Sequence, residues 1–149
     1  ISQKSMKKNI AIIDDHEIVR FGLKKLLSNF SEFHIVFESE SPDKIPQTKG
    51  LDVTLFILDL SFKEGLCDLS CIDKVKHKFP KSKIIIYSML QEDVFGLDVI
   101  KHGAKGFVSK QASADHLIKA INVVYNGNIY LSDNLSNLMA NQLISHQKN

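Results

Sequence analysis

The sequence has no long hydrophobic run, since its longest apolar stretches, such as 55–58 and 84–87, span about four residues. A transmembrane helix needs about 20 consecutive apolar residues, so none fits in these stretches. They are also too short for the apolar core of a secretory signal peptide. We therefore expect a cytoplasmic protein that does not interact with membranes.

The sequence also has only two cysteines and no large excess of charge of either sign. Cys67 and Cys71 could share one side of a helix, but a metal site needs further ligands, and only His77 follows nearby. Two such cysteines fit reduced thiols in a cytosolic protein. The net charge of +2 demands neither nucleic acid nor a membrane surface as a partner. No Walker A loop or G-x-G-x-x-G motif occurs, so nucleotide-dependent chemistry has no support.

What is present is a regular alternation over 149 residues, a length suited to one domain. Short apolar segments predict strands, and segments with apolar positions three or four apart predict helices. The predicted strands are 9–13, 34–37, 53–58, 83–87 and 106–109. The predicted helices are 17–30, 68–79, 94–102 and 113–126, with a short helical segment that opens at Ser41 and is interrupted by Pro46.

The predicted strands are apolar along their whole length, which is typical of a parallel sheet covered by helices on both faces. The fold class is therefore α/β with a doubly wound, five-stranded parallel sheet. Gly103 and Gly127 are placed to end two of the helices. Ser132 resembles the N-cap of one more helix, which carries Leu135 and other apolar residues.

Polar residues follow four of the strands, and in an open α/β sheet the functional site lies beyond these carboxyl ends. Asp14 and Asp15 follow the first strand, Asp59 the third, Ser88 the fourth and Lys110 the fifth. Three neighbouring carboxylates repel one another, which a bound Mg²⁺ and an opposing lysine would relieve. One carboxylate could then attack phosphorus while the others supply positioning and charge.

Each of these residues alone has an ordinary structural explanation. An Asp-Asp pair after a strand is commonly a helix N-cap with a first-turn acid, and a lysine at a strand end is usually a solvated tip. The conjunction argues for function, because separate strand ends supply complementary chemistry in chain order.

Four segments resemble the signatures of bacterial response-regulator receiver domains. They are Ile12-Ile-Asp-Asp-His16, Phe56-Ile-Leu-Asp-Leu60, Ile85-Ile-Tyr-Ser88 and Gly103-Ala-Lys-Gly-Phe-Val-Ser-Lys110. The resemblance covers residues 7–131 and is greatest to the subfamily with a LuxR-type (NarL/FixJ-like) DNA-binding output. Asp-Asp-His, the non-proline after the lysine and Asn126-Gly-Asn-Ile-Tyr-Leu-Ser132 are the features of that subfamily. The resemblance implies a flavodoxin-like strand order, 2-1-3-4-5.

The resemblance also implies a role for each residue of the set. Asp59 would be the phosphoacceptor, and Asp14, Asp15, Asp59 and the backbone carbonyl of Ser61 would hold Mg²⁺. Ser88 and Lys110 would contact the phosphoryl group. Phe107 would be the aromatic switch whose rotamer follows Ser88, although an ordinary core phenylalanine is the alternative. The protein would not be an enzyme beyond catalysing its own phosphoryl transfer and autodephosphorylation.

The expected organisation is an expression remnant at residues 1–5, a receiver domain at 6–131 and a linker helix at 132–149 toward an absent output domain. The implied partners are a sensor histidine kinase, a second copy bound through the face of helix 94–102, strand 106–109 and helix 113–126, and DNA through the output domain only. The full-length protein would thus be a transcription regulator of a two-component system.

Two departures from the family pattern leave alternatives open. The run Leu60-Ser-Phe-Lys-Glu-Gly65-Leu-Cys-Asp68 lacks the usual proline, and Gln111 replaces a proline that is often cis, so the state of the Lys110–Gln111 peptide bond stays open. The alternatives are a pseudo-receiver or stand-alone receiver that acts as a protein–protein interaction switch. A phosphatase of the haloacid dehalogenase class is disfavoured, because Ser61 stands where that class has a second aspartate.

Overall fold

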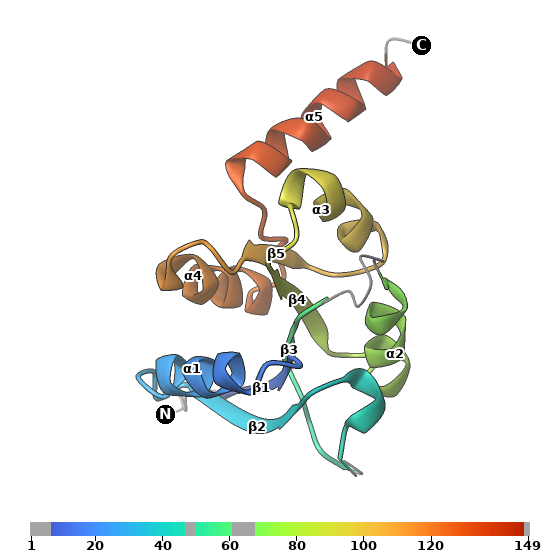
Figure 1. Cartoon of the computed structure of the whole chain (residues 1–149). Helices are drawn as coiled ribbons and strands as arrows, with labels where there is room; N and C mark the ends of the chain where they lie inside the picture. The colour runs from blue at the N-terminus through green and yellow to red at the C-terminus, as the bar shows by residue number, and fades with distance from the viewer. Residues whose placement is uncertain (1–6, 47–49, 61–67, 148–149) are drawn as a thin grey trace, which may run out of the picture.

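Figure 1 shows a central sheet with helices on both sides in a computed structural model, which describes residues 7–46, 50–60 and 68–147. The element order is β1(Lys8–Ile13), α1(Glu17–Leu27), β2(Phe33–Ser39), the 3₁₀ turn η1(Pro42–Lys44), β3(Leu55–Leu58), α2(Ser70–Lys78), β4(Lys83–Ser88), α3(Glu92–Lys101), β5(Gly106–Ser109), α4(Ala114–Tyr125) and α5(Asp133–Gln147). Every expected strand and helix is present.

The five strands are parallel and follow the order β2-β1-β3-β4-β5, as expected from the resemblance. Both neighbours of β1 pair with it in register near its carboxyl end, where Ile12 lies opposite Glu38 of β2 and Ile57 of β3. A shift in register between Ile10 and Ala11 precedes this region. The order of strands reverses between β1 and β3, so their carboxyl ends meet beside the crevice where such folds place their sites.

Alternate strand residues pack on opposite faces of the sheet, which gives the molecule two cores. We call them the α1/α4 face and the α2/α3 face after the helices that cover them, as Figure 1 shows. The α1/α4 face is built mainly from aliphatic residues, including Ile10, Ile12, Leu23, Leu27, Ile57, Leu117 and Ile121. The α2/α3 face includes Ile13, Phe56, Leu58, Ile72, Val75, Ile86, Val99 and Phe107. Continuous apolar strands are thus explained by burial on both sides.

Some element ends differ from the sequence-based expectation. Helix α1 ends at Leu27 rather than at Phe30, because the chain turns there and the amide of Phe30 bonds the carbonyl of Leu27. The helical segment expected from Ser41 is a single 3₁₀ turn of three residues. Gly103 and Gly127 have φ values of +107° and +94°, the left-handed conformation expected after a helix end.

The segment after α4 is attached to the sheet and to α3. Tyr130 forms a parallel bridge with Gly106 at the outer side of β5. Ser132 caps α5, since its Oγ accepts the amide of Leu135 at 3.1 Å, as the N-cap prediction required. Leu135 is fully buried, and a Cβ on Gly96 of α3 would lie only 2.7 Å from its Cδ2 atom. The first turn of α5 therefore packs directly on α3, while Figure 1 shows its other end projecting from the domain.

Within the described ranges, no helix has the length and apolar character needed to cross a membrane.

Candidate functional site

Backbone pairing continues one residue beyond three strands and brings the strand-end residues to one rim of the sheet. The amides of Asp14, Asp59 and Lys110 donate to the carbonyls of Ser39, Ile13 and Ser88 at 3.0, 2.9 and 2.9 Å. Each of these residues thus has the position of a strand residue, although its side chain lies at the open edge. The sequence prediction that these side chains meet at one edge is realised in the structure.

Lys110 lies between two of the carboxylates. Its Nζ atom is 2.7 Å from Oδ2 of Asp14 and 3.1 Å from Oδ2 of Asp59. The exposed fractions of the three side chains are 10%, 2% and 4% in that order. Buried charges of this kind persist only when they are paired. The ammonium group therefore acts as the counter-ion of both carboxylates.

Burial and charge shift the titration of this group of residues. The pKa of Asp59 is raised, mainly because burial disfavours the carboxylate and also because the charge of Asp14 is close; Lys110 opposes this shift. Burial alone would lower the pKa of Lys110, but the bond to Asp14 and the charges of Asp59 and Asp14 raise it. Asp59 is thus a carboxylate whose negative charge is only partly compensated in the absence of another cation.

Four residues could together hold a metal ion, since ligand atoms of Asp14, Asp15, His16 and Asp59 lie within 4.8 Å of one another. The donor set is dominated by carboxylate oxygens, which suit a hard divalent cation. Oδ2 of Asp14 is buried, and its contact among the described residues is the ion pair with Nζ of Lys110 at 2.7 Å. The clustered carboxylates share one lysine, which leaves negative charge that a divalent cation would balance.

His16 is a member of this cluster to which the sequence analysis gave no role. Its amide donates to Oδ1 of Asp14 at 2.8 Å. Its ring Nδ1 lies 3.0 Å from Oδ1 of Asp15 and 3.3 Å from Oδ1 of Asp14. The Asp-Asp-His order was visible in the sequence, but the turn that folds the ring back over both carboxylates was not.

Ser88 is buried, with 1% of its surface exposed. Its hydroxyl donates to the carbonyl of Leu60 at 3.5 Å and accepts the amide of Leu90 at 3.1 Å. Leu60 is the residue after Asp59, so the serine contacts the main chain beside Asp59. Ser61, expected to supply a metal-binding carbonyl, lies outside the described residues.

Comparison with known proteins decides the family. Residues 10–122 match the response regulator receiver domain. The chain belongs to this family.

Among its relatives, oxygen regulatory protein NreC of Staphylococcus haemolyticus (strain JCSC1435) is 30% identical over 142 residues, which are 93% of this chain and 64% of NreC. The chain thus spans less than two thirds of that relative. The isolated receiver domain of RcsB from Salmonella enterica serovar Typhimurium, solved with the phosphomimetic BeF₃⁻, has a TM-score of 0.76 and 29% identity over 89% of this chain and 98% of that domain. A structure of RcsB dimers bound to DNA has a TM-score of 0.77 and 29% identity over 89% of this chain and 66% of that protein.

The receiver family and the strand order were both predicted correctly from the sequence. Phe107, which the resemblance implies as the aromatic switch, is buried in the core of the α2/α3 face with 1% exposure. No cis peptide bond occurs among the described residues, so the Lys110–Gln111 bond of this receiver is trans. The run 61–67 that departs from the receiver pattern lies outside the described residues.

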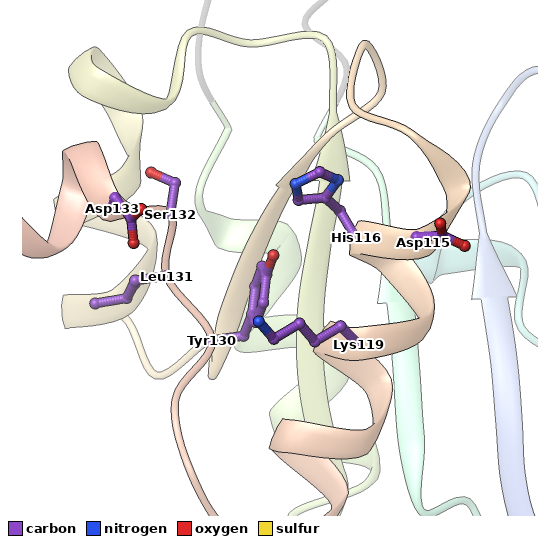
Figure 2. Close-up of a pocket in the computed structure, with 7 residues that line it drawn as sticks. All are labelled: Asp115, His116, Lys119, Tyr130, Leu131, Ser132 and Asp133. Carbon is purple, nitrogen blue, oxygen red and sulfur yellow. The ribbon is translucent and has the colours of Figure 1, made fainter.

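The hollows that the described residues of this receiver line include two of different size. The larger, of about 500 Å³, separates α1 from the end of β4 and reaches Lys110. It is lined by His16, Ile18, Val19, Gly22, Leu23, Leu26, Tyr87, Met89 and Lys110. Figure 2 shows the smaller, of about 280 Å³, where His116 and Lys119 of α4 reach toward Tyr130. None of the strand-end carboxylates lines the smaller hollow.

Proposed function

We propose that this receiver takes up a phosphoryl group on Asp59 in a reaction that requires Mg²⁺. The observation that carries the proposal is the buried contact of Lys110 with both Asp59 and Asp14 at the rim of the sheet. A lysine on the fifth strand end that pairs with the carboxylates of two other strand ends is arranged for an incoming anion. A solvated surface lysine would have no need of such burial.

The chemistry follows from the charges. A carboxylate oxygen of Asp59 bonds to phosphorus while the bond from phosphorus to the leaving group of the phosphodonor breaks. Such transfers are accelerated by positioning and by charge stabilisation of the phosphoryl oxygens. Lys110 lies within 3.1 Å of Asp59 and can shift to the new anion without leaving the rim. The chain would turn over no outside substrate, since the phosphoryl group stays on its own side chain until hydrolysis.

Mg²⁺ would supply the positive charge that the site lacks. Asp14 and Asp15 would hold it, together with Asp59 and the carbonyl of Ser61. The close approach of the Asp14, Asp15 and Asp59 carboxylates and the raised pKa of Asp59 both support a cation at this position. Mg²⁺ commonly uses one or two carboxylates with water and phosphate oxygens, which this set provides.

Ser88 and Phe107 would report the phosphorylated state. The hydroxyl of Ser88 is bound to the main chain of Leu60 and would move to the phosphoryl oxygens. Its departure would change the packing beside Phe107, because Ile86, two residues before Ser88, lies opposite Phe107 and both face α2 and α3. A doubly charged group with strong acceptors is sufficient to bias two states of this kind.

The partners proposed for this receiver follow from its surface and its relatives. A sensor histidine kinase would dock beside the site, where Ile18, Phe21 and Met89 are 76%, 56% and 59% exposed around α1 and the end of β4. Dimerisation would use the face of α3, β5 and α4, part of which α5 already covers. DNA binding would require a further domain, as in the RcsB complex with DNA.

The proposed organisation is a receiver domain at 6–131 and a linker segment from 132, whose described helix is α5(Asp133–Gln147). We further propose that the protein is cytoplasmic and that it regulates transcription. The second assignment is supported by RcsB, a similar protein that binds DNA as a dimer.

The proposal is tested by intact mass spectrometry after incubation with acetyl phosphate and Mg²⁺. We expect a gain of about 80 Da, the mass of one phosphoryl group. The gain should disappear in Asp59→Asn protein and in wild-type protein treated with EDTA. Asp68→Asn is a matched control, because Asp68 is an exposed carboxylate outside the site, and it should still gain the mass.

No gain with acetyl phosphate or with a cognate kinase would overturn the proposal in favour of a pseudo-receiver. Release of phosphate well beyond one equivalent from a generic phosphomonoester would indicate an enzyme instead.

A further inference from the structure

Arg20 of α1 bonds the peptide group that joins the two aspartates after β1. We propose that Arg20 is a positioning residue, which fixes this peptide and thereby the two carboxylates, Asp14 and Asp15, for a divalent cation. The inference rests on the Mg²⁺ site of the proposed function and adds a residue that does not itself contact the cation.

The guanidinium group of Arg20 is held from two sides. Its Nη1 donates to the carbonyl oxygen of Asp14 at 2.6 Å, and its Nε donates to Oε1 of Glu38 at 2.7 Å. Only 15% of the side chain is exposed. Because the guanidinium is planar and rigid, two bonds to different acceptors fix its position and orientation. An arginine used only as a solvated helix charge would show neither the burial nor the second acceptor.

Glu38 anchors the arginine to the sheet. It belongs to β2 and lies opposite Ile12 in the register with β1. Lys24, one turn further along α1, also pairs with Glu38. The bond from Lys24 and the bond from Arg20 hold the pKa of Glu38 below its usual value, against the opposing effect of burial. The glutamate therefore stays charged, and α1, β2 and the end of β1 are joined through it.

The bonded carbonyl belongs to the residue that carries the most buried carboxylate of the site. Asp14 is 2% exposed, and its amide is already held by Ser39 at 3.0 Å. Arg20 therefore completes the fixation of the Asp14 main chain. The same peptide group connects Asp14 to Asp15, so its rotation would move the carboxylates of both residues. Metal sites need ligands held within about 0.5 Å of the productive geometry, and partners that orient ligands are accordingly important for affinity.

The direction in which Mg²⁺ affinity changes on replacement of Arg20 distinguishes a positioning role from a purely electrostatic one. A guanidinium near the cluster repels a cation, so if charge alone mattered, its removal would strengthen Mg²⁺ binding. Loss of a positioning bond would weaken binding. Lys24 is a matched control, since it has the same charge, lies on the same helix and pairs with the same glutamate, but has no bond to Asp14.

The experiment is a calorimetric Mg²⁺ titration of wild-type, Arg20→Gln, Arg20→Lys and Lys24→Gln proteins. Circular dichroism first checks that each protein is folded at the temperature of the titration. We expect Arg20→Gln to bind Mg²⁺ about tenfold more weakly, and Lys24→Gln to bind as tightly as wild type or more tightly. Lysine cannot donate to both acceptors in one fixed fork, so Arg20→Lys should weaken binding about threefold. In metal-free protein, the amide resonances of Asp15 and His16 should shift in Arg20→Gln and not in Lys24→Gln.

Unchanged or tighter binding by Arg20→Gln would overturn the inference, as would an equal loss in Lys24→Gln. If Arg20→Gln does not fold, Arg20→Lys decides by the same titration, and affinity equal to wild type would then contradict the inference. A wild-type protein that binds no Mg²⁺ would overturn the proposed function itself, so the two failures are distinguishable.

Discussion

The two faces of the sheet are built differently. On the α1/α4 face, mainly aliphatic side chains fill the core, with one pair of rings, Phe30 and Phe33, 5.2 Å apart. Helix α1 is joined to the main chain of Asp14 by the bond from Arg20. On the α2/α3 face, Phe37, Phe56 and Phe79 form an aromatic group with ring centroids 5.1–6.2 Å apart. This face also carries Phe107, and its helix α3 supports α5.

The residues proposed to bind the cation and the residues proposed to move belong to different faces of the sheet. Alternate residues of a strand share one face of the sheet. Asp14 and Asp59 lie two residues after Ile12 and Ile57, which face α1 and α4. Ser88 continues Ile84 and Ile86, which face α2 and α3. The groups proposed to hold the cation and accept the phosphoryl group thus belong to the side that is bonded to α1. The side with the proposed moving residues is the one in contact with α5.

Neighbouring positions of β3 allow the two cores to be compared directly. Phe56→Ala should lower the free energy of unfolding by about 4 kcal/mol, and Ile57→Ala by about 3 kcal/mol, because both are almost fully buried and each leaves a cavity. Urea unfolding followed by circular dichroism measures both. A smaller loss for Phe56 than for Ile57 would mean that the aromatic group does not make the α2/α3 face the more sensitive core.

A second prediction concerns the charge at the rim, and its sign depends on pH. The pKa of Asp59 is raised in the folded state, so its contribution to stability is full below the unfolded pKa and is lost as pH rises through the folded pKa. Without Mg²⁺, Asp59→Asn should therefore be more stable than wild type at pH 7, on the order of 1 kcal/mol or about 3 °C in Tm.

The gain should vanish in acid, where Asp59 is protonated in the folded wild-type protein too. Thermal unfolding between pH 4 and 7.5 in EDTA tests this. Equal Tm values at pH 7 would show that Lys110 compensates the carboxylate fully.

The smallest changes in stability should come from replacing two helical glycines, one on each face of the sheet. A Cβ on Gly22 of α1 would meet nothing within 4 Å, whereas one on Gly96 of α3 would meet Leu135. Gly22→Ala should therefore stabilise the domain by about 0.5–1 kcal/mol through helix propensity. Gly96→Ala should stabilise the domain less, because its methyl group would push Leu135 of α5 away from α3. Faster hydrogen exchange of the α5 amides would detect this weaker packing. Undisturbed protection of α5 in Gly96→Ala would contradict the close packing of these helices.

The strand-end carboxylates and the lysine could be predicted from the sequence because parallel strands place their carboxyl ends together, and apolar runs show where strands end. Interactions between distant charged residues left no such signal. Arg20 and Glu38 are 18 positions apart on different elements, and each alone resembles a solvated charge. The contact of Leu135 with Gly96 was missed for a similar reason, because periodicity identifies an apolar stripe but not the surface that receives it.

The bridge between Gly106 and Tyr130 has a consequence for behaviour in solution. As the last strand of the sheet, β5 would present unpaired main-chain groups, which can pair with a strand of another molecule. The amide of Tyr130 bonds the carbonyl of Lys105 at 2.9 Å, and the amide of Phe107 reaches the carbonyl of Tyr130 at 3.4 Å. The chain that follows α4 thus shields the amino-terminal part of this edge, and there it hinders aggregation by strand addition.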